Sequence, residues 1–97
     1  MFDFERWCRW VEEESKQVQS SSIAVEFVRG KLSPKPGASV SFKSDQKLLQ
    51  LSFWVTGEAD FFGLNTVTGA DIVYFQGRML DDSTFPQTYK ECLATAQ

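Results

Sequence analysis

Two Thr-Gly pairs divide the stretch from Leu48 to Phe75, LLQLSFWVTGEADFFGLNTVTGADIVYF, into three runs of alternating apolar residues. This alternation has the period of a β-strand with one buried face. Glycine tolerates the positive φ that tight hairpin turns need. The stretch therefore predicts a three-strand antiparallel meander against which the rest of the chain must pack.

The turn positions set which residues of the meander pair. A first turn at residues 56–59 places Val55 opposite Asp60, and a second at residues 68–69 places Val67 opposite Ala70. This register points the following side chains inward: Leu51, Phe53, Phe62, Leu64, Val73 and Phe75. It leaves three aromatic residues together on the outward face: Trp54, Phe61 and Tyr74. A slip of one residue would exchange the two faces, so this aromatic patch depends on the turns.

The remaining chain supplies two amphipathic helices and two further strands. Apolar residues at helical spacing predict a helix from Phe2 to about Gln19 and another after Asp81-Asp82-Ser83, where Pro86 fits the first turn. Alternating runs around Val25 and Val40, joined by a proline-containing turn over residues 33–37, predict the first hairpin. The fold class is α+β: a helix, about five antiparallel strands and a helix, with both helices on the Leu51/Phe53 face.

Length and charge fit one small domain spanning residues 1–97. Thirteen acidic against ten basic side chains give a net charge of −3. Residues 21–47 carry two acids and five bases, a balance of +3, whereas residues 48–97 carry six acids and two bases, a balance of −4. An acidic meander that also exposes aromatic residues favours a cationic protein partner over nucleic acid.

No apolar run approaches about 18 residues, and the charged N-terminus does not read as a signal peptide, so we expect a cytoplasmic protein without a membrane segment. Cys8 and Cys92 fall on the two predicted helices without metal or redox spacing. They are interpreted as small buried apolar residues, and a disulfide between the helices stays open.

The sequence offers few residues that could support catalysis. The sequence contains no histidine, the commonest general base and metal ligand, and its glycines form no phosphate-binding loop. Glu58 and Asp60 belong to the first turn and Asp71 to the second, about 20 Å away along the strands, so they cannot share a metal or a substrate. We therefore expect neither an enzyme nor a bound metal or cofactor.

The run Trp54-Val55-Thr56-Gly57-Glu58-Ala59-Asp60, followed by Thr68-Gly69, resembles the core of small bacterial immunity proteins, notably the TriTu group. The resemblance implies a non-enzymatic intracellular protein that neutralises a toxin domain by tight binding, typically the product of a neighbouring gene. An acidic, aromatic surface fits such a role, because it can cover a basic toxin site by complementarity. In this hypothesis Trp54, Phe61 and Tyr74 are apolar anchors, and Glu58, Asp60 and Asp71 are charge complements.

Two other function classes remain open. The basic first hairpin could serve an adaptor or nucleic-acid-binding module through Arg29, Lys31, Lys35, Lys43 and Lys47. Alternatively, the outward sheet face could hold together a homodimeric structural subunit. Steep loss of affinity with salt would indicate the first, and a dimeric mass without any added partner would indicate the second.

Overall fold

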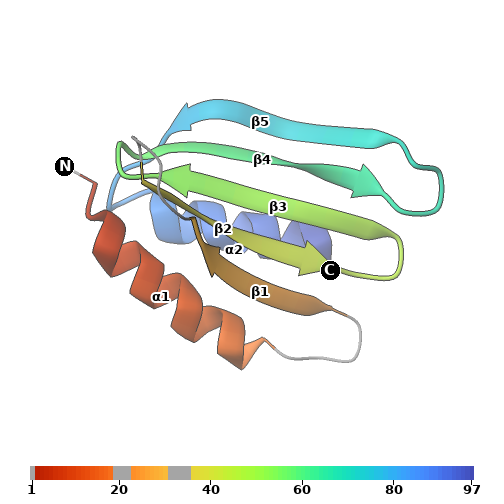
Figure 1. Ribbon diagram of the computed structural model, residues 1–97, viewed down its shortest axis with the longest axis horizontal. Coiled ribbons are helices and arrows are strands. Elements are labelled where there is room, and N and C mark those ends of the chain that lie inside the picture. Colours follow the sequence, from red (N-terminus) through yellow and green to blue (C-terminus); the bar gives the residue numbers. More distant parts are fainter. Residues whose placement is uncertain (1, 19–22, 31–35) are drawn as a thin grey trace.

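The computed structural model of the protein describes residues 2–18, 23–30 and 36–97. Within these residues the chain forms two helices and a five-stranded sheet (Figure 1). In chain order the elements are α1 (Phe4–Gln17), β1 (Ala24–Arg29), β2 (Gly37–Lys43), β3 (Lys47–Trp54), β4 (Glu58–Asn65), β5 (Asp71–Met79) and α2 (Phe85–Ala96). The predicted element order and the α+β class are confirmed. Residues 33–35 of the predicted proline-containing turn lie outside the described residues.

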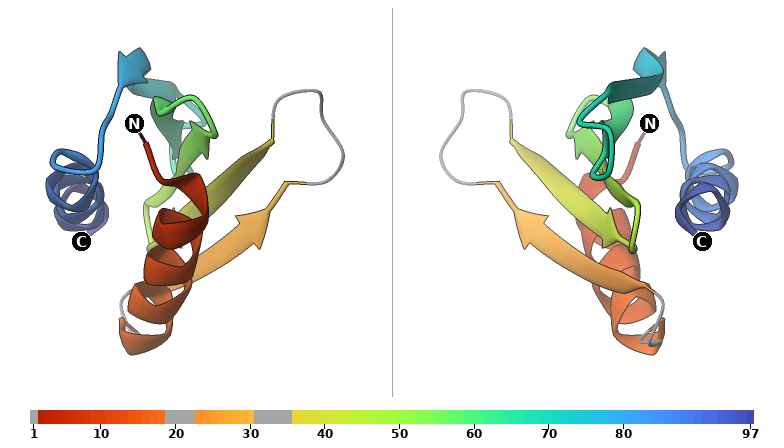
Figure 2. Two further views of the ribbon diagram at one scale, coloured as in Figure 1. Left: turned by 90° about the vertical axis from the view of Figure 1, so that its left-hand side faces the viewer. Right: turned by 90° about the vertical axis from the view of Figure 1, so that its right-hand side faces the viewer.

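The five strands form an antiparallel meander in the order β1-β2-β3-β4-β5. Both helices pack on one side of this twisted sheet, as predicted, and no described helix covers the other side (Figure 2). We call these sides the helix face and the open face. The central strand β3 points Leu49, Leu51 and Phe53 at the helix face, and all three are fully buried. The alternation that predicted its buried side is therefore confirmed.

Aromatic rings fill the space between the sheet and the two helices. The Phe53 ring of β3 lies 4.9 Å from that of Phe85 at the start of α2, centroid to centroid, and 5.7 Å from that of Phe4 in α1. Trp7 of α1 stacks on Phe85 at 5.2 Å. Both helix starts are thus fixed to the same end of β3 by rings that exclude water.

An acidic pair joins the two helix starts by hydrogen bonds. The Asp82 carboxylate accepts from the Trp7 indole Nε1 at 2.7 Å and from the Asp3 backbone N at 2.9 Å. Its neighbour Asp81 accepts from the backbone N atoms of Ser83 and Thr84, both at 2.9 Å. The side-chain hydrogen bond from Ser83 and the backbone one from Thr84 hold the pKa of Asp81 down at about 2. Asp81 thus orders the turn before α2, whose N-cap residue is Thr84, while Asp82 fastens α1 to that turn.

The predicted register of the β3–β4 hairpin is wrong by three residues. Phe53 pairs with Ala59 and not with Phe62. The loop is one residue shorter than predicted: Gly57 N donates to Trp54 O at 2.8 Å, and Gly57 itself takes the left-handed conformation with φ of 91°. Because the offset is odd, β4 is turned over. Phe61 points at the helix face and Phe62 at the open face.

The β4–β5 hairpin also differs from the prediction, but by an even offset at its turn. The Asn65 side-chain oxygen accepts from the backbone N atoms of Val67 and Thr68, which sets a four-residue loop in place of the expected two-residue one. Phe62 therefore lies opposite Val73, and Val73 points outward, not inward as predicted.

One strand further along, the ladder between β4 and β5 is irregular. Phe61 pairs with Phe75, so Tyr74 is an extra residue, and a second register shift follows between Ala59 and Phe61. Gly77, with φ of 65°, donates its backbone N to the Asp60 carboxylate at 2.7 Å and so fixes this second shift. Phe75 consequently returns to the helix face, as predicted.

Candidate functional site

The open face is the surface of the sheet on which a partner can lie without displacing a described helix (Figure 2). Its β2 and β3 portion is polar, with Ser39, Ser41 and Ser52 side by side across the two strands. The Gln50 amide donates to Ser52 Oγ at 3.0 Å and keeps this portion hydrogen-bonded. The remaining portion, over β3 to β5, has a different chemistry.

Four apolar side chains gather on the open face where β3, β4 and β5 run together. Leu48 pairs with Leu64, and Phe62 with Val73, so the four form one patch, which we call the apolar patch. Val73 is 61% exposed, Leu48 39% and Phe62 38%. Exposed apolar side chains that adjoin one another, unlike scattered ones, mark surfaces that bind a partner.

Charge is divided between the two faces of the sheet. On the open face the strands carry four acidic side chains and one basic one, Lys43, a balance of −3. The four acids are Glu26, Glu58, Asp60 and Asp71. The three other basic strand residues, Arg29, Lys47 and Arg78, fall on the helix face. The open face therefore presents an apolar patch within an acidic surround.

Trp54 lies on the open face, as predicted, at the end of β3. It is half-buried because its indole lies over Gly37 of β2: a Cβ atom at that glycine would come within 2.7 Å of Trp54 Cδ1. The missing side chain at Gly37 thus gives the indole its place. Trp54 is separated from the apolar patch by Ser52 and Asp60, so it does not belong to that patch.

The predicted aromatic cluster does not form on the open face. Phe61 is 2% exposed and packs on the helix face, 6.3 Å from the Phe42 ring. Tyr74 stacks on Phe61 at 4.7 Å with an interplanar angle of 22° and is 40% exposed at the β5 edge. The hairpin offset is the physical reason: sequence reasoning chose Phe61 where the structure exposes its neighbour Phe62, and it missed Leu48, Leu64 and Val73. The asparagine and glycine that set the turn lengths were the only signals pointing to them.

The three predicted acidic residues, Glu58, Asp60 and Asp71, differ in their position on the sheet and in their polar contacts. Glu58 and Asp71 lie at opposite ends of the sheet, as predicted, since Glu58 pairs with Met79 and Asp71 with Leu64. Asp60 is half-buried and accepts the hydrogen bond from Gly77, so its carboxylate has a structural task. Asp71 is exposed and makes no ion pair with any residue that the structure describes.

The basic residues of the first hairpin are not gathered on one surface. Arg29 forms an ion pair with Glu5 and lies 5.4 Å above the Phe4 ring, on the helix face. Lys47 donates to Thr95 O at 3.3 Å, also on the helix face, whereas Lys43 is on the open face. Lys31 and Lys35 lie outside the described residues. The described bases therefore give no continuous cationic path for a nucleic-acid backbone.

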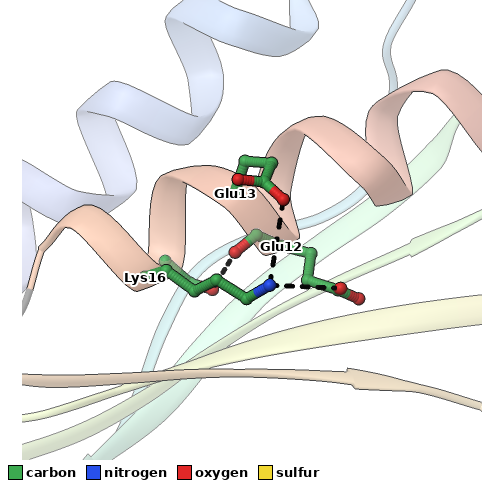
Figure 3. A network of polar contacts seen from close by, with 4 residues as sticks. Glu12, Glu13 and Lys16 are labelled. Atoms are coloured by element: carbon green, nitrogen blue, oxygen red, sulfur yellow. Dashed lines mark hydrogen bonds and ion pairs between the residues drawn. The ribbon is translucent and has the colours of Figure 1, made fainter.

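Glu12 and Glu13 of α1 face solvent, whereas Glu14 is half-buried. Lys16 Nζ lies 3.7 Å from a Glu12 carboxylate oxygen and 3.8 Å from one of Glu13 (Figure 3). All three side chains are more than half exposed, so each ion pair is weak.

Two thiols are the strongest nucleophiles of the chain, and both are sealed in the core. Cys8 and Cys92 are each 2% exposed and carry no disulfide bond. Burial raises the pKa of the Cys8 thiol to about 11 and that of Cys92 to about 12, so both are protonated at neutral pH. Across the described residues, no group of three or more Cys, Asp or Glu side chains is placed to hold a metal ion.

Neither α1 nor α2 combines the length and the apolar composition that crossing a membrane requires. Comparison with known proteins gives one match. The family model described as Immunity protein TriTu matches residues 4–95, which include every helix and strand except the last residue of α2. No curated protein and no solved structure matches the chain. The chain belongs to the TriTu family of immunity proteins.

Proposed function

We propose that this protein protects a bacterial cell by binding a cognate toxin domain in the cytoplasm and blocking it by steric and electrostatic cover, without chemistry of its own. The match to an immunity protein family over residues 4–95 carries the proposal. Immunity proteins are generally non-enzymatic. The buried, protonated thiols fit this role, because they offer no accessible nucleophile.

The open face is the proposed toxin-binding surface. Its apolar patch supplies area that gains free energy when covered, and its acidic surround favours a basic toxin and speeds their encounter. Of the anchors expected from the sequence, Trp54 is kept, and Phe62 takes the place of the buried Phe61. Tyr74 stacks on Phe61 and lines the helix-face side of the β5 edge, so it is not part of the proposed surface.

The two alternative functions have less support on this surface. A polyanion would meet four acidic strand residues and one lysine on the open face. A second copy would set a face of charge −3 against another of the same sign, which costs free energy in a dimer. A basic protein partner has no such penalty.

The test uses the cognate toxin domain, which we expect a neighbouring gene to encode. Co-expression with the protein should rescue growth, and the purified pair should form a complex measurable by calorimetry. Phe62→Ser should weaken the complex by about thirtyfold, the effect of removing an interface hot spot. The matched control is Val67→Ser, which changes an apolar residue that is 73% exposed in the β4–β5 turn.

The outcomes separate function from surface. If the unaltered protein neither rescues growth nor binds the toxin, the proposed function is wrong. If it does both, but Phe62→Ser binds as tightly as the Val67→Ser control, toxin neutralisation stands and the open face is not the surface used.

A further inference from the structure

A shallow cavity of about 320 Å³ adjoins the apolar patch at the β5 edge of the sheet. Its lining residues are Phe62, Gly63, Asp71, Ile72, Val73 and Gln76. Phe62 and Val73 are cross-strand neighbours and make an apolar floor. Asp71 stands two positions before Val73 on the same face of β5, about 7 Å along the strand. The cavity thus pairs an apolar floor with a carboxylate at one end.

The chemistry of this cavity suits an amphipathic cationic side chain. Lysine and arginine bury an aliphatic stem along apolar surface while the charged end reaches an acceptor. A cation over an aromatic ring gains further attraction. The same arrangement already occurs within the chain on the helix face, where Arg78 Cζ lies 4.0 Å from the centre of the Phe75 ring. The cavity on the open face likewise has an aromatic ring, Phe62, and it also has a carboxylate, Asp71, but no described residue supplies a cation there.

We propose that this cavity receives a lysine or arginine side chain of the toxin, with its stem across Phe62 and Val73 and its charge against Asp71. The inference rests on the proposed function and adds the chemistry of the contact. Charge favours a cationic occupant of the cavity over an acidic one. The cavity lies on the open face, whose strand residues have a net charge of −3, and the Asp71 carboxylate is exposed and has no ion-pair partner in residues 2–18, 23–30 or 36–97. An acidic partner or the same face of a second copy would be repelled there.

The experiment measures binding of the purified neighbouring-gene toxin domain to the full chain and to three variants by calorimetry. Asp71→Asn removes the charge with little change in shape and should raise Kd about tenfold. Asp71→Glu keeps the charge and should recover most of the affinity. Glu26→Gln removes a charge from the same face at the β1 edge, away from the cavity, and should change Kd by less than about twofold.

Salt gives a second readout that a structural role would not produce. Raising the salt concentration from 50 to 300 mM should weaken the complex of the unaltered chain more than that of Asp71→Asn, because one screened charge pair is already gone in the variant.

Two results would overturn the inference while leaving toxin binding intact. Asp71→Asn could bind as tightly as the unaltered chain; if Phe62→Ser still weakened binding in that case, the contact would be purely apolar. Glu26→Gln could lose as much affinity as Asp71→Asn, which would mean a diffuse electrostatic field and no specific contact. Failure of the unaltered chain to bind would instead refute the proposed function.

Discussion

Gly57→Ala and Gly69→Ala are a matched pair of substitutions that test why the meander has the register observed. Both glycines end a hairpin turn with positive φ, 91° at Gly57 and 75° at Gly69. An added Cβ at Gly69 would meet nothing within 4 Å. At Gly57 it would come well under 3.0 Å from the Leu80 backbone oxygen and 3.3 Å from the Phe2 Cβ. The backbone strain is thus shared, and the steric clash is confined to Gly57.

The expected losses differ accordingly. A left-handed alanine costs about 1 to 2 kcal/mol, offset in part by the lower entropy of the unfolded chain, so Gly69→Ala should lower the free energy of unfolding by about 1 kcal/mol. Gly57→Ala should cause the same strain and, in addition, push the end of β5 away from the turn. The hydrogen bond from Leu80 N to Gly57 O, 2.8 Å long, would break or lengthen, and Phe2 would shift in the core. We expect a total loss of about 3 kcal/mol.

Urea denaturation followed by tryptophan fluorescence measures both values, and thermal melts should show losses in Tm of about 5 and about 15 °C. Equal losses for the two variants would refute the reasoning, because they would mean that the Gly57 turn is not pressed between Phe2 and Leu80. A smaller loss at Gly57 than at Gly69 would further contradict the short-loop register.

Three further predictions concern the core and the surface. Tyr89 is 2% exposed, and its hydroxyl finds no hydrogen-bond partner among the described residues. Tyr89→Phe should therefore leave the free energy of unfolding unchanged or raise it by up to about 1 kcal/mol, as measured by urea denaturation. A loss above about 1 kcal/mol would reveal a partner outside the described residues. Because the folded-state pKa is about 11 for Cys8 and about 12 for Cys92, whereas a thiol in an unfolded chain titrates near ~8.5, their stabilising contribution is complete below about pH 8 and is lost as the pH rises towards 12. Urea midpoints between pH 7 and 11 should show this decline, and Cys8→Ala should make it shallower; an equal slope would count against the assignment. Lys16→Ala should change the free energy of unfolding by less than about 0.5 kcal/mol, since its two ion pairs are exposed, and a loss above 1 kcal/mol on denaturation would mean that α1 depends on them.

The local sequence was sufficient to predict the buried face of an element wherever it contained only one periodic pattern of apolar residues. In β3 the residues Leu49, Leu51 and Phe53 alternate with polar or wetted positions, so only one face can be buried, and the structure buries that face. The helices were predictable for the same reason, since each has one apolar stripe. Packing of both helices on one face followed from that single buried side of the sheet.

The faces of β4 could not be predicted from its pattern. Phe61 and Phe62 are adjacent, so either phase of the alternation buries one phenylalanine and exposes the other. The choice is made at the turn, by a glycine whose fit depends on Phe2 and Leu80, residues distant from it in the sequence. In β5 the bulge at Tyr74 inserts a residue and ends the alternation altogether. Trp54 and Asp71 therefore lie on the open face, as predicted, whereas Phe62 takes the place of Phe61 in the proposed binding surface.

The two register shifts of β5 have a consequence for how the chain behaves at high concentration. β5 ends the sheet, and an edge strand with free backbone groups is a template on which other chains can add. A regular strand of nine residues, rich in apolar side chains, would be a strong template. The extra residue at Tyr74 and the left-handed Gly77 held by Asp60 divide it, so that only the short run from Asp71 to Val73 precedes the first interruption. The Asp60 carboxylate of the open face thus also helps to prevent fibrous self-association at the β5 edge.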